Sequence, residues 1–300
     1  MITLTIRKFR VSMLMLLIGI SVLHGSYAQS LKGIIANYAK QPLSLYQCYG
    51  DTLLLVDSTH TDKNGAFSFF FNHGQGNLAN LQNHGSDNGG LYKVVLQRNQ
   101  WFYVLYDGKP TEIKTLFQSN TLYNIATDSL KILKSEENKR FYEFQNKQQQ
   151  LNVANYFLLQ MMRLYPLPDP FHKQIEDEYF KRYAAMEQLV NVKNLSGLIA
   201  KAYYQPVNPD WKQPDNWRDS IIAAHYFDYF NPSDSFYLHT NILPEKMDIY
   251  LSLRTNKRDA YGQPVSDKML FATAAKDFLE KTASPQLLPE LLFKEIQQRA

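Results

Sequence analysis

The pattern of hydrophobic and polar positions changes once along the chain. In the first third, short runs that alternate apolar and polar side chains recur about every ten residues, which is typical of a β-sandwich or barrel. The predicted strands cover 31–36, 43–48, 52–58, 66–71, 91–96, 101–106 and 112–117. Asn64-Gly65 lies between two of these runs and predicts a β-hairpin. Residues 73–90, rich in Gly, Asn and Gln, predict a long loop.

After about residue 128, apolar positions recur every three or four residues, which is the period of a helix. Ser135 is suited to cap the first helix, and Asp169-Pro170 is suited to open the second. The predicted helices cover 136–165, 170–192, 195–203, 217–226, 267–281 and a last segment from 285. The pattern therefore predicts an α+β protein, with an N-terminal antiparallel β-sandwich followed by a C-terminal helical bundle.

The N-terminus has the layout of a cleavable secretory signal. Arg7, Lys8 and Arg10 precede an apolar run at 11–23, and small residues precede a cleavage position after Ala28. A helix of this run would be about 20 Å long, too short for the ~30 Å membrane core, which favours cleavage over an uncleaved anchor. The mature protein is expected to be periplasmic or secreted, with no stable membrane span. The predicted divisions are a signal peptide at 1–28, a β-sandwich domain at 29–125 and a helical domain at 126–300.

Composition and charge narrow the candidate functions. Tyr, Phe and Trp make up 14% of the chain, which supplies rings for a large core and for surfaces. The single cysteine excludes a disulfide framework and a Cys-rich zinc site. The formal charge of +4 includes the three cations of the signal, and no Lys/Arg run remains after cleavage, so nucleic acid is not an expected partner.

Motifs for catalysis are missing from the sequence. It has no G-x-S-x-G or phosphate-binding glycine loop, and its histidines are too scattered for a paired metal motif. Cys48, in a predicted strand, is interpreted as a small buried hydrophobe, with an exposed thiol or an intermolecular partner as alternatives. No catalytic residue, metal or cofactor is predicted, although the sequence leaves open whether the chain is an enzyme.

Aromatic residues and prolines are concentrated between 203 and 230. Exposed rings there would form a platform for a sugar or a peptide. The alternative, which we favour for the segment as a whole, is that the rings fill seams between helices and domains. The candidate binding residues are Trp211, Trp217, His225, Tyr226 and Tyr229.

Two stretches resemble a known protein family. The first consists of Leu31-Lys32-Gly33-Ile34, Val56-Asp57-Ser58-Thr59 and Asp62-x-Asn64-Gly65-x-Phe67-x-Phe69. It resembles the β-rich domain that precedes the thioredoxin-like domain in exported thiol-disulfide oxidoreductases of the TlpA/ResA type. The second consists of His225-Tyr226-Phe227-Asp228, Phe230, Asp234, Leu238, Leu243 and Tyr250. It is similar to a helical segment that follows in the same proteins.

The resemblance implies the non-catalytic N-terminal region of such an oxidoreductase. The WCxxC motif of the thioredoxin-like domain does not occur here, and a single thiol cannot both attack and resolve a mixed disulfide. The preferred hypothesis is an exported, non-catalytic accessory module with a protein partner in the cell envelope and an open oligomeric state. The alternatives are an oxidoreductase whose catalytic domain is missing or lies beyond residue 300, and a carbohydrate or peptide binder that uses the Tyr/Trp-rich surface.

Overall fold

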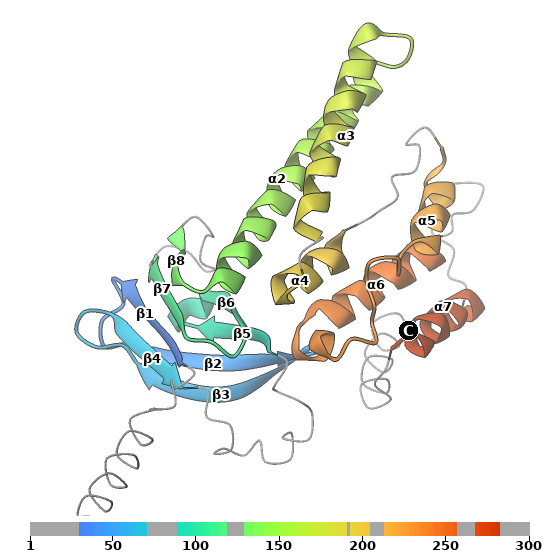
Figure 1. Ribbon diagram of the computed structural model, residues 1–300. Helices are drawn as coiled ribbons and strands as arrows, with labels where there is room; N and C mark the ends of the chain where they lie inside the picture. The colour runs from blue at the N-terminus through green and yellow to red at the C-terminus, as the bar shows by residue number, and fades with distance from the viewer. Residues whose placement is uncertain are drawn as a thin grey trace, which may run out of the picture.

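The α+β class is confirmed in the computed structural model, which describes residues 30–70, 89–118, 129–190, 193–204, 213–256 and 268–282. Strands come first along the chain and helices follow, as Figure 1 shows. The predicted signal peptide, nearly all of the predicted loop at 73–90 and the last predicted helix from 285 lie outside the described residues. No helix within the described ranges is both long enough and apolar enough to cross a membrane.

The described strands form two four-stranded sheets. Their bounds are β1 Ser30–Ala36, β2 Pro42–Tyr49, β3 Thr52–His60, β4 Ala66–Phe70, β5 Gly90–Val95, β6 Trp101–Tyr106, β7 Thr111–Leu116 and β8 Lys131–Lys134. One sheet has the order β4-β1-β7-β8, and the other has the order β3-β2-β5-β6. Alternate side chains of both sheets are buried in one shared core, among them Leu31, Ile35, Phe69, Leu45, Val94 and Val104. The two sheets therefore form the predicted sandwich.

The sandwich differs from the prediction in one pairing and in one additional strand. β1 and β7 pair in parallel, because the chain passes through the second sheet between them. β8 pairs antiparallel with β7 and lies beyond residue 125, inside the range predicted to be helical. Its sequence, Lys-Ile-Leu-Lys, is too short to show an alternating pattern, and Leu133 is 57% exposed.

The predicted hairpin at Asn64-Gly65 is wrong, although the turn itself is present. The two strands that it connects belong to different sheets: β3 pairs with β2, and β4 pairs with β1. The Asp62 carboxylate accepts hydrogen bonds from the backbone N–H groups of Asn64 and Ala66 and so holds the turn. Gly65 has φ +79°, and a Cβ there would lie 2.1 Å from the carbonyl oxygen of Ile35 on β1. A glycine is required because the turn packs directly onto the neighbouring strand.

Helices make up most of the remaining described chain. Their bounds are α2 Glu136–Leu164, α3 Pro170–Val190, α4 Leu195–Tyr203, α5 Asp215–Ala224, α6 Ile242–Thr255 and α7 Lys268–Glu280, with short 3₁₀ helices η3 Gln97–Asn99 and η5 Ser235–His239. The predicted helices match α2, α3, α4, α5 and α7 to within about two residues, apart from the cap at Ser266, which lies outside the described residues. α6 was not predicted, because Lys246 interrupts its buried apolar face and Pro244 lies in its first turn.

The first turns of α2 attach the helices to the sandwich. β6 is an edge strand, and its outward backbone groups need partners. The Asn138 side chain accepts from Leu105 N–H at 2.8 Å and donates to Leu105 C=O at 2.7 Å, as a neighbouring strand would. The Tyr142 hydroxyl donates to the carbonyl of Tyr103. α2 therefore covers this sheet edge, with Ser135 as the predicted cap.

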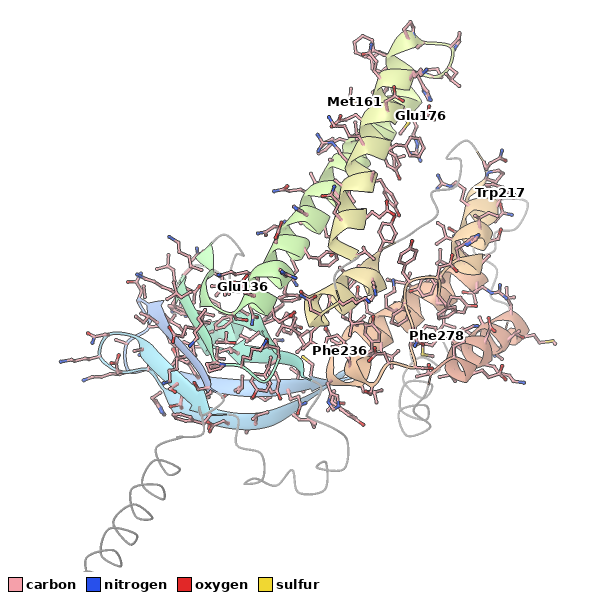
Figure 2. The ribbon with its side chains drawn as sticks, in the orientation of Figure 1. Glu136, Met161, Glu176, Trp217, Phe236 and Phe278 are labelled. Carbon is pink, nitrogen blue, oxygen red and sulfur yellow. The ribbon has the colours of Figure 1, made fainter. Side chains whose placement is uncertain are left out.

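Beyond these turns, α2 and α3 extend together away from the sandwich. Figure 1 shows the pair as a long projection, with α4 and α6 at its base and α5 and α7 beside α6. Figure 2 shows Glu136 at the base of α2 and Met161 far along the projection. Beyond residue 144, only Met162 of α2 is buried. We call the outer part of this helix pair, residues 148–180, the arm.

Candidate functional site

Three of the predicted binding residues lie at the surface. Trp217 is on α5 and is 43% exposed (Figure 2). His225 ends α5, and its Nδ1 lies 2.8 Å from the carboxylate of Asp228, with both side chains about half exposed. Tyr229 packs edge-on against Tyr204, with ring centroids 5.0 Å apart, and is 36% exposed. These residues present separate rings rather than a continuous platform of stacked faces.

Tyr226, in contrast, points into the molecule. Its hydroxyl donates to the backbone carbonyl of Lys246 at 2.6 Å, and burial raises its pKa. Its ring packs against those of Phe227, Phe230 and Tyr250. Phe227 and Phe230 in turn contact a ring of α7. Tyr226 thus fills a seam between helices, which is the alternative that we favoured for this segment. Trp211 lies outside the described residues.

A buried lysine lies at the centre of this aromatic seam. The side chain of Lys246, on α6, is 8% exposed, and its Nζ lies 4.6 Å from the ring centroid of Tyr226. The rings of Tyr203 and Phe230 lie 5.7 and 5.9 Å from the same atom. Within the described part of the chain, no carboxylate forms an ion pair with it. Burial lowers the pKa of Lys246 to about 8, and the nearby charge of Glu245 opposes this shift.

Glu245 and two tyrosines connect the lysine to the sandwich. The hydroxyl of Tyr203, on α4, donates to the Glu245 carboxylate at 2.6 Å. Tyr103, on β6, receives a hydrogen bond of 3.4 Å from the side-chain amide of Asn241, and burial raises its pKa to about 12, with Cys48 and Glu245 adding to the shift. These contacts join β6, α4 and α6 at the base of the arm.

Cys48 is buried, as predicted. It is fully inaccessible to solvent in β2, and burial raises the pKa of its thiol to about 12. A thiol with such a pKa is protonated at neutral pH and is a poor nucleophile. Cys48 therefore acts as a small apolar side chain in the sandwich core.

Sequence reasoning missed the residues around Lys246. Tyr203 was noted only as part of the aromatic concentration, and Tyr103 only as a position within the predicted strand 101–106. The one available signal was in α6, where Lys246 is spaced four residues from both Ile242 and Tyr250, so that a cation occupies an otherwise apolar helix face. A charge at such a position is unusual because its burial is costly.

The charged side chains of Glu245 and Lys246 already interact with other residues of the protein. The Glu245 carboxylate accepts from Tyr203 and the Lys246 ammonium faces aromatic rings, so both charges already have partners. Among the described residues, no three His, Cys, Asp or Glu side chains come together in a way that would hold a metal ion. The group joins helices to the sandwich and offers a fixed base for the arm.

The arm carries the largest concentration of exposed apolar side chains among the described residues. Tyr156, Phe157 and Leu164 of α2 are 62%, 60% and 75% exposed. The other exposed large apolar residues of the arm are Val153, Met161, Tyr165, Leu167, Phe171 and Phe180. We call Val153, Tyr156, Phe157, Met161 and Leu164 the outer stripe. Monomeric proteins rarely leave a large contiguous apolar surface in water, and such surfaces mark interaction sites.

Sequence reasoning predicted α2 but not the exposure of its outer half. Phe141, Phe144, Phe157 and Met161 were read as steps of three and four residues, which is the period of a helix. In the structure the first two are 2% exposed, whereas Phe157 is 60% exposed. A helical period identifies the helix but does not show which of its sides the rest of the fold covers.

Comparisons with known proteins add little to this description. No family model matches the chain, and no curated protein matches it. One similar solved structure is described as "NMR structure of the protein from Eubacterium rectale" and is 13% identical. The match covers 37% of this chain and 94% of that chain, with a TM-score of 0.20. A likeness this slight carries no argument about fold or function.

Proposed function

We propose that this chain is an exported, non-catalytic module that binds a protein partner in the cell envelope through its arm. The observation that carries the proposal is the outer stripe, where side chains as large as Tyr and Phe are about 60% exposed. The predicted signal peptide and the resemblance to the N-terminal region of envelope oxidoreductases support the compartment. The attachment of α2 to β6 supports a role in which the sandwich holds the arm in position.

The polar residues of α2 along the outer stripe favour a protein over other partners. From Gln148 to Met162, α2 contains no charged residue, and its polar side chains are all Gln or Asn. Anionic lipids and nucleic acids are bound with the help of Lys and Arg side chains. Protein interfaces, in contrast, are poor in charge at their centre and rich in aromatic residues and Met. The composition of this surface therefore fits a protein interface.

A photo-crosslinking experiment in the native envelope tests the proposal. A photoreactive phenylalanine analogue replaces Tyr156 in one variant and Leu55 in a control variant. Leu55 is a suitable control because it is apolar and 56% exposed but lies on β3, in the sandwich. We expect a discrete crosslinked protein band from the arm position and none from the control. Equal labelling at the two positions, or none at Tyr156, would contradict the proposal.

A further inference from the structure

We infer that the protein bound by the arm is a second copy of this chain, which packs against the outer stripe in an antiparallel, two-fold arrangement. The inference rests on the proposed function, since it names the partner of the same surface. It is drawn from the distribution of apolar side chains around α2, from their spacing along it and from the polar residues between them.

Around the helix axis, α2 is apolar on two opposite sides of the arm. Successive residues are turned by about 100°, which places Val153, Phe157 and Leu164 within roughly 40° of one another. Leu151, Leu158 and Met162 fall on the opposite side, where they are half-buried or buried. An apolar side of a helix is normally covered by another surface. The described chain covers one side of the arm helix and leaves the other in water.

Along the helix axis, four of the five residues of the outer stripe form pairs about a midpoint between residues 158 and 159. Val153 and Leu164 are equally far from this point, and so are Tyr156 and Met161. Phe157 has its counterpart in Gln160, which is half-buried. Val153 and Leu164 also lie within about 20° of each other around the axis, so a two-fold axis through the midpoint would place Val153 of one copy opposite Leu164 of the other, with Tyr156 and Met161 on the two flanks of the contact. This is the requirement for a self-complementary interface.

The polar residues near the stripe are also compatible with a copy of themselves. Gln149, Gln150 and Gln160 lie on or beside the outer face. A carboxamide carries both donors and an acceptor, so two identical amide side chains can pair, whereas two identical charges repel. No charge lies between residues 148 and 162, and Arg163, beside Leu164, lies about 14 Å along the axis from its own counterpart. Two stripes can therefore meet with little like-charge repulsion.

The area and the geometry suit a dimer. Five side chains that are 39–75% exposed leave on the order of 500 Å² of apolar surface in water, since each has a full area of roughly 150–230 Å². An interface with about 57% apolar area would then bury on the order of 900 Å² per copy, close to the ~800 Å² of a standard interface. The midpoint lies about 34 Å along α2 from Glu136, so the two bodies lie at opposite ends of the paired arms without clashing.

A crosslinking test uses single cysteines in the mature chain. Val153→Cys and Leu164→Cys are prepared separately and then mixed under mild oxidation, with the native Cys48 buried in the sandwich. In the two-fold arrangement, residue 153 of one copy faces residue 164 of the other. Because 11 residues of helix separate positions 153 and 164, residue 153 of one copy lies about 16 Å from residue 153 of the other, and the same holds for residue 164. We expect a disulfide dimer from the mixture and little from either variant alone. Trp217→Cys, mixed with either variant, is the exposed control.

Sedimentation of the mature chain over a wide concentration range gives the second measurement. We expect a monomer–dimer equilibrium whose Kd rises at least about a hundredfold in Phe157→Lys, because each dimer would bury two unpaired ammonium groups. Leu55→Lys, on the sandwich, should leave Kd unchanged. A monomer at every concentration, or disulfide formation without preference for the mixture, would overturn the inference. If the Tyr156 photo-crosslink to a different protein persists in that case, the proposed function stands and only the partner is wrong.

Discussion

The two halves of α2 carry similar aromatic side chains in opposite environments. In the first half, Phe141 and Phe144 are 2% exposed and lie where the helix meets β6 and α4. In the second half, Tyr156 and Phe157 are about 60% exposed on the arm. Part of the difference is the side of the helix, since Phe157 lies about 140° around the axis from Phe144, and the rest is what lies beside each half. The first half is part of a folded body, and the second is a surface that the body presents.

The largest expected effect comes from removing a ring in each half. Phe141→Ala should lower the free energy of unfolding by about 3–5 kcal/mol, because it leaves a cavity at the junction with the sandwich. Phe157→Ala should change it by no more than about 0.5 kcal/mol, since an exposed ring has little native packing to lose. Urea unfolding of the chain at a concentration where it is monomeric measures both. A large loss in Phe157→Ala at that concentration would mean that the ring packs within its own chain.

A smaller effect is expected from the hydrogen bonds at the base. Asn138→Ala removes both partners of the Leu105 backbone and should cost about 2–4 kcal/mol, because a buried N–H and C=O are left without partners. Asn152→Ala, at an exposed position of the same helix, is the matched control and should cost less than about 0.5 kcal/mol. Amide hydrogen exchange at Leu105 should accelerate only in the first variant. Equal costs in the two variants would show that α2 does not stabilise the β6 edge.

The sequence predicted elements better than it predicted their partners. Strands β1–β7 were found because their alternation is a local property, and β8 was missed because four residues cannot show one. The turn at Asn64-Gly65 was found, but its local signal cannot tell that β4 pairs with the distant β1 rather than with β3. α6 was missed because Lys246 occupies a buried position of its apolar face. In each case the missing information is a long-range contact.

The same limit applies to the candidate sites. The rings of the 203–230 segment were recognised as either surface or core, and only the three-dimensional packing separates Tyr226, in the seam, from the exposed Trp217. The arm contains no motif, and its apolar periodicity resembles that of any buried helix. Its exposure follows from the length of α2, which continues beyond the sandwich and α4 into a region where only one of its sides is covered.

The smallest expected effect concerns Lys246 at the base of the arm, whose ammonium group is surrounded by aromatic rings rather than by water. The pKa of Lys246 is lowered to about 8 by burial, whereas an unfolded lysine has a pKa near 10.4. Below about pH 8 the lysine is charged in both states, and the full cost of burying the charge is present. Between about pH 8 and pH 10 the folded state loses its proton first, so the unfolded state binds more protons and stability rises with pH.

Lys246→Met tests this balance, because it keeps the unbranched chain and removes the ammonium. Burial of the charge corresponds to about 3 kcal/mol, and contacts with the three rings offset about 0.5–2 kcal/mol of it. The variant should therefore be more stable than the native chain by about 1–2 kcal/mol at pH 7, and this gain should shrink as the pH approaches 9.5. Lys276→Met, at an exposed position of α7, should show neither effect. If Lys246→Met instead loses stability at pH 7 with no dependence on pH, the rings stabilise the ammonium by more than burial costs, and the charge itself holds the base of the arm together.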